Sequence, residues 1–342
     1  MAEPEFPILE LHTVCAISAI EWFKVSMSVV GIFGFILSIT TILIVYFKSP
    51  PCMKKFKIYL LLYTFCNGIF ELSILLLKPV IIPVYLILYP QGLLSPMSDL
   101  SIRMSMSAAL ISCIGLLACF LCMLVERFFA MSNITQTNLL FYRNPTCYIL
   151  FIGFCFFYMS LVIIYHVVYG GMMRSPEETA AIIKRYIIGG DYLLNQQQVL
   201  ISADFKKLRI FMYFIGLPNF IYVIAFTVFF VLCARKVKKS MLCFSEQTRT
   251  NHLMLFRCII FQCVSMSILV IVPAVTFVIG LIFDISPTLL LIPIILIWSF
   301  PIVDNLVTLV TITPYRTFIV STVFKYKKTT AINTVRNNDN RK

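Results

Sequence analysis

Four ionisable side chains lie inside long apolar segments, and they are the first residues of this chain whose chemistry needs an explanation. Glu71 and Asp304 stand alone in their segments, whereas Asp99 and Arg103 are four residues apart. Such residues are costly in a membrane and usually face the interior of a helix bundle. The i, i+4 spacing of Asp99 and Arg103 puts them one helical turn apart, where they can pair. Structural pairing and ligand binding both explain this pair.

The residue patterns of common catalytic and metal sites are missing from the sequence. No phosphate-binding Gly-rich loop, nucleophile elbow or metal-spaced His cluster occurs, and the chain has three His in all. We therefore predict no catalytic residue, no metal site and no cofactor.

The composition is that of a membrane protein with several helical spans. Hydrophobic residues make up 60% of the 342 residues and charged residues 13%, whereas about a quarter of a typical soluble chain is charged. The apolar runs exceed the roughly 10 alternating residues of a barrel strand. The net charge of +13 does not indicate nucleic-acid binding, because the cations sit in short segments between apolar runs, where they meet anionic lipid.

The apolar runs predict an all-α bundle of seven transmembrane helices, since about 20 apolar residues cross a bilayer. The predicted spans are approximately 22–47, 58–77, 99–124, 146–169, 210–233, 256–283 and 288–312. Between the second and third spans, the proline-rich segment 78–94 is predicted to be an outer loop near the membrane interface.

Lysine and arginine predict the orientation of the bundle. Four, two, six and seven of the 28 cations fall in 48–57, 125–145, 234–257 and the chain after 312, while the opposite segments hold seven. Cytoplasmic loops carry the excess of cations. We therefore predict an extracellular N-terminal segment (1–21), a membrane domain (22–312) and a cytoplasmic tail (313–342). An odd span number without internal repeats favours a receptor over an enzyme.

Several segments resemble a known family. They are FKSPPCMKKFKIYLLLY (47–63), KPVIIPVYLILYPQGLL (78–94), SPEETAAIIKRY (175–186) with VLISAD (199–204), and TPYR (313–316). In these segments the chain resembles the nematode serpentine chemoreceptors of class H, with class I as near kin, which are seven-transmembrane receptors of the G-protein-coupled type. One departure lies in span seven, where FPIVDNLVTLVTI (300–312) replaces the His-Gly and Ser-Thr of the class H pattern.

The resemblance implies a function and a location. It implies a chemosensory receptor, as in olfaction, that binds an extracellular small molecule in the outer half of the bundle and activates a heterotrimeric G protein. It also implies a multi-pass protein of the plasma membrane, in a sensory-neuron cilium. A seven-span transporter or ligand-gated channel is the alternative. The sequence leaves open whether the protein acts alone or as a homodimer or heterodimer.

The resemblance also assigns roles to residues. Glu126 and Arg127 resemble the acidic-Arg pair of rhodopsin-like receptors, in which Arg127 would pair with Glu126 at rest and meet the G protein on activation. An interfacial anchor that reaches toward water is the alternative. The candidate ligand pocket comprises Glu71, Asp99, Arg103 and Trp298.

Two further groups are predicted near span seven. Asp304 and Asn305, with Asn67 of span two as a partner, indicate a buried polar network or ion site that changes between states. Pro314, Tyr315 and Arg316 form the signature at the end of span seven. Proline ends or bends the helix, tyrosine suits the headgroup layer and arginine starts the basic tail.

Overall fold

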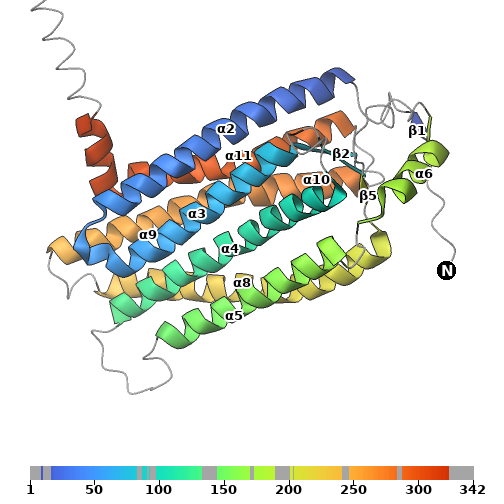
Figure 1. Cartoon of the computed structure of the whole chain (residues 1–342). Coiled ribbons are helices and arrows are strands. Elements are labelled where there is room, and N and C mark those ends of the chain that lie inside the picture. Colours follow the sequence, from blue (N-terminus) through green and yellow to red (C-terminus); the bar gives the residue numbers. More distant parts are fainter. Residues whose placement is uncertain are drawn as a thin grey trace, which may run out of the picture.

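The protein forms a single bundle of long antiparallel helices in a computed structural model (Figure 1). The structure describes residues 9–10, 17–82, 87–90, 92, 98–132, 145–169, 173–188, 201–202, 204–240, 246–282 and 287–322. The first part of the N-terminal segment, the cations beyond 322 and much of the predicted third loop lie outside these residues.

Seven spans make up the bundle, as the sequence predicts. They are α2 (Ile17–Lys48), α3 (Lys54–Leu77), α4 (Asp99–Ser132), α5 (Pro145–Ile164) continued by the π-helix η4 (Tyr165–Tyr169), α8 (Phe205–Ser240), α9 (Glu246–Met266) continued by the π-helix η5 (Ser267–Ile271) and α10 (Val272–Ile282), and α11 (Pro287–Thr311). A short 3₁₀ turn, η1 (Pro51–Met53), joins α2 to α3.

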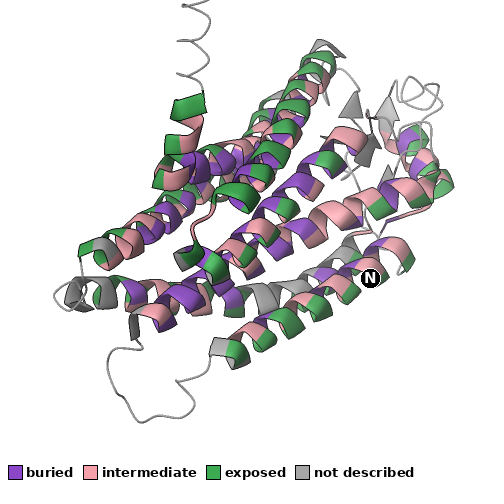
Figure 2. Ribbon diagram, turned by 60° about the vertical axis from the view of Figure 1, so that its left-hand side comes forward, coloured by how far each residue is buried: buried purple, intermediate pink, exposed green. Residues whose placement is uncertain are grey.

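Length and composition suit these helices to a bilayer. Within the described residues, six helices are long and apolar enough to cross a membrane, and α8 adds the apolar stretch Phe220–Arg235. Their outward faces carry exposed apolar side chains such as Phe33, Phe154 and Ile268, and Figure 2 shows buried residues on the inward faces. Exposed apolar faces of this kind are expected where hydrocarbon is the solvent.

Helix α4 lies at the centre of the bundle. It packs against α3, α5 and α8 along much of its length, and α11 packs against α2 and α9. The α2–α3 contact is close because glycines line it: Gly31 lies against Leu75, and Gly68 lies against Ser38. Small residues let membrane helices approach and gain van der Waals contact, which lipid does not supply.

Short strands cap the end of the bundle where α3 ends and α4 begins, which we name the sheet end. Strands β2 (Pro79–Ile82) and β3 (Ile87–Pro90) form an antiparallel hairpin, and β3 also pairs with β5 (Ile201–Ser202). Strand β1 (Leu9–Glu10) pairs with β4 (Ile187–Ile188), which follows the helix α6 (Pro176–Tyr186). The segment predicted as a loop is therefore partly a hairpin, because its β-branched and aromatic residues are also typical of strands.

The turn out of α3 depends on two unusual backbone positions. Lys78 adopts a left-handed conformation (φ 40°) and its N–H donates to the Ile74 carbonyl at 2.6 Å. Gly92 N–H donates to the Leu77 carbonyl at 3.1 Å, and a Cβ at Gly92 would overlap the Leu76 carbonyl oxygen. The helix end therefore receives its capping contact from a residue that has to be glycine.

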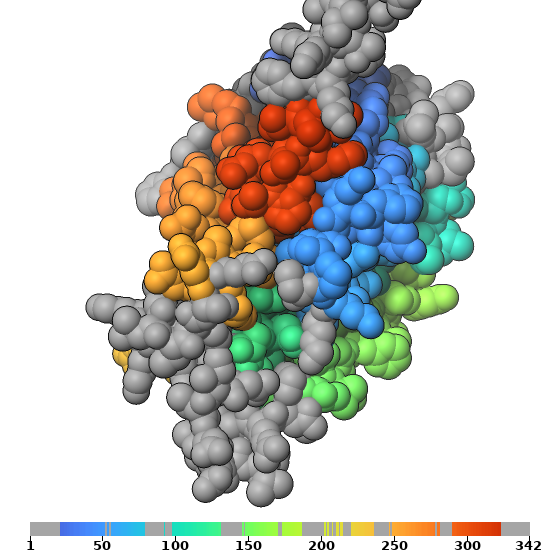
Figure 3. All heavy atoms as spheres, turned by 90° about the vertical axis from the view of Figure 1, so that its left-hand side faces the viewer, coloured from blue at the N-terminus to red at the C-terminus, as the bar shows by residue number. Residues whose placement is uncertain are grey.

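The opposite end of the bundle, where α2 ends and α11 is followed by the rest of the chain, is named the tail end. A further helix, 313–322, follows α11 there and turns away from its axis. Figure 3 shows this helix against the ends of α2 and α3 on one side and α9 on the other. The start of the predicted tail is thus an ordered part of the bundle.

Replacing Gly92 by Ala is expected to destabilise the protein by about 1–3 kcal/mol, because the added methyl group must displace backbone atoms of the α3 terminus. The control is Gly153→Ala in α5, where a Cβ meets nothing within 4 Å and alanine favours the helix. Thermal melting of the purified variants in detergent measures the stability change for Gly92→Ala and for Gly153→Ala. Equal melting temperatures for the two variants would contradict the capping role.

Candidate functional site

A polar cluster lies inside the bundle between α2, α3, α9 and α11. Asn67 Nδ2 donates to Asp304 Oδ2 at 3.2 Å, which agrees with the partner expected from the sequence. Asn305 Nδ2 donates to Ser38 Oγ at 2.9 Å. All four side chains are buried, so each hydrogen bond ties two spans together away from water.

The cluster extends to α9 through Gln262. Its Nε2 donates to Thr308 Oγ1 at 3.2 Å, and both side chains are buried. Gln262 and Tyr63 also lie beside the carboxylate of Asp304. Gln262, Thr308 and Tyr63 were not predicted from the sequence, although a Gln inside an apolar span is itself a signal of interhelical hydrogen bonding.

Hydrogen bonding in the cluster is incomplete. Among the described residues, Asn67 Oδ1, Gln262 Oε1 and Asp304 Oδ1 are buried acceptors without a donor. A buried polar network that is partly satisfied is weakly specified, because other pairings of the same groups cost little more. The cluster is therefore suited to rearrangement when the spans shift.

Glu71 occupies a separate position between α3 and α2. Its carboxylate lies directly against Gly34, where any Cβ would collide with it, and neither oxygen has a hydrogen-bond partner among the described residues. Glycine at position 34 thus makes room for a buried carboxyl group. Glu71 points to the α2 interface, and the residues that line the central cavity do not include it.

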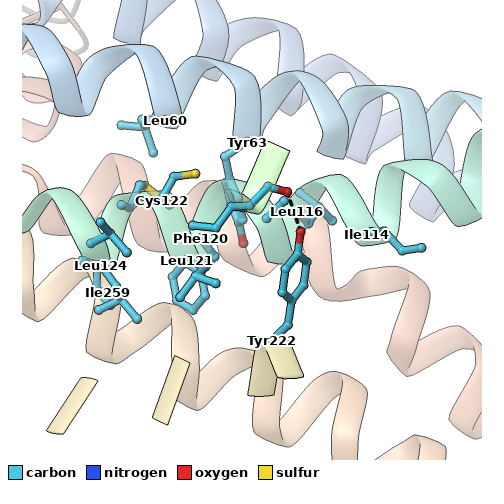
Figure 4. Packing of buried hydrophobic residues seen from close by; sticks show 14 of the residues in the cluster. Leu60, Tyr63, Ile114, Leu116, Phe120, Leu121, Cys122, Leu124, Tyr222 and Ile259 are labelled. Atoms are coloured by element: carbon cyan, nitrogen blue, oxygen red, sulfur yellow. Dashed lines mark hydrogen bonds between the residues drawn. The ribbon is translucent and has the colours of Figure 1, made fainter. Parts of the chain in front are cut away.

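The central cavity lies at mid-depth between α3, α4, η5 and α11. Its volume is about 130 Å³, and its lining is almost wholly apolar. The lining residues are Tyr63, Phe70, Cys113, Leu116, Leu117, Phe120, Met266, Val270, Ile297 and Phe300. Figure 4 shows Tyr63 reaching from α3 toward Phe120 of α4, whose ring centroid is 6.0 Å away.

Proline residues place irregular backbone beside this cavity. Pro273 lacks an N–H and its ring would clash with the Leu269 carbonyl, and the helix widens there into η5, which carries the lining residue Val270. In α11, Pro301 leaves the carbonyl of the lining residue Ile297 without its usual helical donor. The cavity therefore touches the two spans at their most deformable points.

Glu126 and Arg127 are buried near the tail end. The Arg127 guanidinium lies 4.7 Å from the centroid of the Phe56 ring, and it is also close to Cys233 of α8 and His252 of α9. Glu126 lies near Tyr59 of α3. The sequence-based anchor alternative does not fit this burial, because an anchor reaches toward water.

Comparison with known proteins identifies the family. Residues 18–325 match the family described as serpentine type 7TM GPCR chemoreceptor Srh. The chain belongs to this family. This family is one of receptors rather than of enzymes.

The seven-helix fold also has a counterpart among solved structures. Squid rhodopsin superposes with a TM-score of 0.64 over 95% of this chain and 91% of that chain, at 10% sequence identity. At this identity the likeness shows the shared seven-transmembrane fold and nothing finer. No curated protein matches the sequence.

The four residues predicted as a ligand pocket in this Srh receptor do not line the central cavity. Asp99 accepts two bonds from Arg103 Nε at 3.0 and 2.9 Å, as the spacing predicts, and Arg103 Nη2 donates to the Arg174 carbonyl at 3.3 Å. This pair therefore fastens the connection after η4 to the sheet end of α4. Trp298 packs on Phe23 of α2, with ring centroids 5.9 Å apart, because it lies on the side of α11 that faces α2.

Tyr315 of the Pro-Tyr-Arg signature is fully buried at the tail end of the bundle, and its position at the depth of the headgroup layer stays a prediction. Its hydroxyl lies 2.6 Å from Ser49 Oγ, which in turn donates to the Val45 carbonyl. Burial raises the pKa of Tyr315 to about 12, although the Ser49 hydrogen bond lowers it. Arg316 is exposed, and Pro314 stands in the first turn of the helix 313–322, where proline is favoured.

The hydrogen bond between Asn305 and Ser38 is expected to contribute about 0.6 kcal/mol, the average for such bonds between membrane helices. A double-mutant cycle with Asn305→Ala and Ser38→Ala should reveal a coupling of that size in the free energy of unfolding. Thr40, which bonds only within its own helix, supplies the control cycle Asn305→Ala with Thr40→Ala. Full additivity in the first cycle would show that the contact does not hold α2 to α11.

Tyr315→Phe is expected to lower stability by about 1 kcal/mol, because it removes one hydrogen bond and keeps the buried ring. The folded-state pKa exceeds the ordinary value of 10.0, so the protonated phenol favours folding below pH 10 and this contribution disappears as pH rises to about 12. The variant should therefore lose less stability than the unsubstituted protein between these pH values. Tyr213→Phe, at an exposed position in α8, controls for general alkaline effects in the same melting experiment.

Proposed function

We propose that this Srh family member is a chemosensory receptor that binds a small extracellular molecule inside its helix bundle and activates a heterotrimeric G protein. The sheet end would face the outside and the tail end the cytoplasm, as the distribution of Lys and Arg predicts. One observation carries the proposal: Tyr63 both lines the central cavity and lies beside Asp304.

Tyr63 connects the ligand cavity to the polar cluster. A molecule in the cavity would press on Tyr63, Val270 and Phe300, and so on α3, η5 and α11 together. Only a difference in affinity between two arrangements can drive a signal. The incomplete hydrogen bonding around Asp304 supports a second arrangement of similar energy.

The path continues to the tail end through α9. This helix carries Gln262 in the polar cluster and His252 near Arg127. An outward movement of the tail-end halves of α8 and α9 about η5 would open the surroundings of Arg127, which could then meet the G protein. Cations on the tail end favour contact with anionic lipid as well.

Arg127→Ala is expected to reduce G-protein nucleotide exchange at least tenfold in cells that express the full chain and are exposed to a panel of neutral volatile molecules. The reason is that the substitution removes the buried guanidinium that would meet the G protein. Arg185→Ala is the control, because Arg185 lies at the sheet end, over the ring of Tyr186.

Two further readouts separate the proposal from the alternatives. A C-terminal tag should be stained only after permeabilisation, and its intensity normalises the amount of each variant. Ligand-evoked currents or uptake that persist in Arg127→Ala without any G-protein dependence would favour a channel or transporter.

A further inference from the structure

The chemistry of the central cavity restricts what it can hold. Among the described residues, ten line the cavity; Tyr63 and Cys113 are the ones with a side-chain hydrogen-bond donor, and none of the ten carries a formal charge. Moving a charged group from water into such surroundings is strongly unfavourable without a partner. A cationic or anionic ligand would find none in this lining.

The charged groups near the sheet end do not change this. The Arg103 guanidinium is used by Asp99 and by the Arg174 carbonyl. The Glu71 carboxylate lies against Gly34 on the far side of α3 from the α4 lining. Asp304 lies beside Tyr63 but is not among the described residues that line the cavity. The described lining therefore contains none of the four ionisable residues that lie inside the spans.

The size of the cavity sets a second restriction. Its volume is about 130 Å³, and an apolar cavity of about 150 Å³ stays dry and binds benzene. Five aromatic or aliphatic residues from α3 and α4, and four apolar residues from α9, η5 and α11, surround this space. The fit is for one ring or a short branched chain.

From these restrictions we propose that the central cavity binds an uncharged, largely apolar molecule of about the size of a substituted benzene. This inference rests on the proposed function, because it assigns that molecule as the receptor's ligand. Tyr63 and Cys113 supply the polar contacts, so a single hydrogen-bonding substituent is tolerated and aimed at α3 or α4. A molecule in the cavity would displace Tyr63, and this movement would reach Asp304, beside which Tyr63 lies.

The test is direct binding of fluorobenzene to the full chain in lipid nanodiscs, followed by ¹⁹F NMR. Saturable binding is expected, and 4-fluorobenzylammonium, which has a similar shape and a charge, should bind at least tenfold more weakly. Cys113→Phe fills the cavity and should weaken fluorobenzene binding at least tenfold. Ile268→Phe is the matched control, since Ile268 is exposed on the outward face of η5, and it should leave binding unchanged.

A second variant guards against misfolding of Cys113→Phe. Leu117→Ala enlarges the cavity and should allow saturable binding of 1-fluoronaphthalene, which the unsubstituted protein binds at least tenfold more weakly. Equal binding of fluorobenzene to all variants, or equal binding of the charged probe, would overturn the inference and assign the signal to the bilayer.

The same samples distinguish this inference from the proposed function. Nucleotide exchange on an added heterotrimeric G protein is measured with each probe. Binding that follows the cavity variants without any effect on exchange would uphold the cavity as a binding site and overturn its assignment as the receptor's ligand site. The opposite result is that a molecule stimulates nucleotide exchange and its binding is unchanged by Cys113→Phe. This result would uphold the receptor function and overturn the cavity assignment.

Discussion

Hydrogen bonding around Asp304 connects the spans in the interior of this protein. In lipid, no hydrophobic driving force brings helices together, because the lipid tails are as apolar as the side chains. Membrane helices are therefore held by close packing and by interhelical hydrogen bonds. Asp304 meets Asn67 of α3 and lies beside Tyr63 and Gln262, while its neighbour Asn305 bonds to α2. One turn of α11 thereby contacts three other spans, α2, α3 and α9, through polar side chains.

The same turn of α11 lies next to the part of the bundle that is least regular. Pro301 precedes Asp304 by three residues, and η5 interrupts the neighbouring span just before Pro273. The cavity lies between these two irregular points, so the molecule that we propose as its ligand would contact both spans. Packed interiors change between discrete arrangements rather than bending continuously, so a small molecule at this place has a large structural effect available to it.

At the tail end, the buried Tyr315 holds the start of the helix 313–322 against the end of α2. Ser49 anchors the tyrosine, Lys48 lies 4.4 Å from the centroid of the Phe318 ring, and the Thr313 N–H contacts the Met254 sulfur at 3.2 Å. The helix 313–322 is therefore tied to both α2 and α9. Helix α9 thus contacts this helix through Met254 and lies near Arg127 through His252.

Much of the fold and part of the site follow from the sequence. Hydropathy sets the number of spans because the bilayer fixes the length of an apolar helix, and the i, i+4 spacing of Asp99 and Arg103 sets their pairing. The sequence predicted Asn67 and Asp304 as partners, because ionisable residues in membrane spans face the bundle interior and pair with other polar groups. The short strands at the sheet end were missed, since their apolar residues resemble those of an interfacial loop.

The sequence by itself thus determined that the chain spans a membrane as a seven-helix bundle, and it singled out some of the buried polar residues, Asn67 and Asp304 among them. Only the tertiary structure decided which way those residues point. Helix rotation turns Trp298 toward Phe23 and Glu71 toward Gly34, and leaves the cavity to largely apolar side chains of α3, α4, α9, η5 and α11. The reason is that, in a span apolar on every side, hydrophobic periodicity does not fix the inward face, so packing against neighbouring helices sets it.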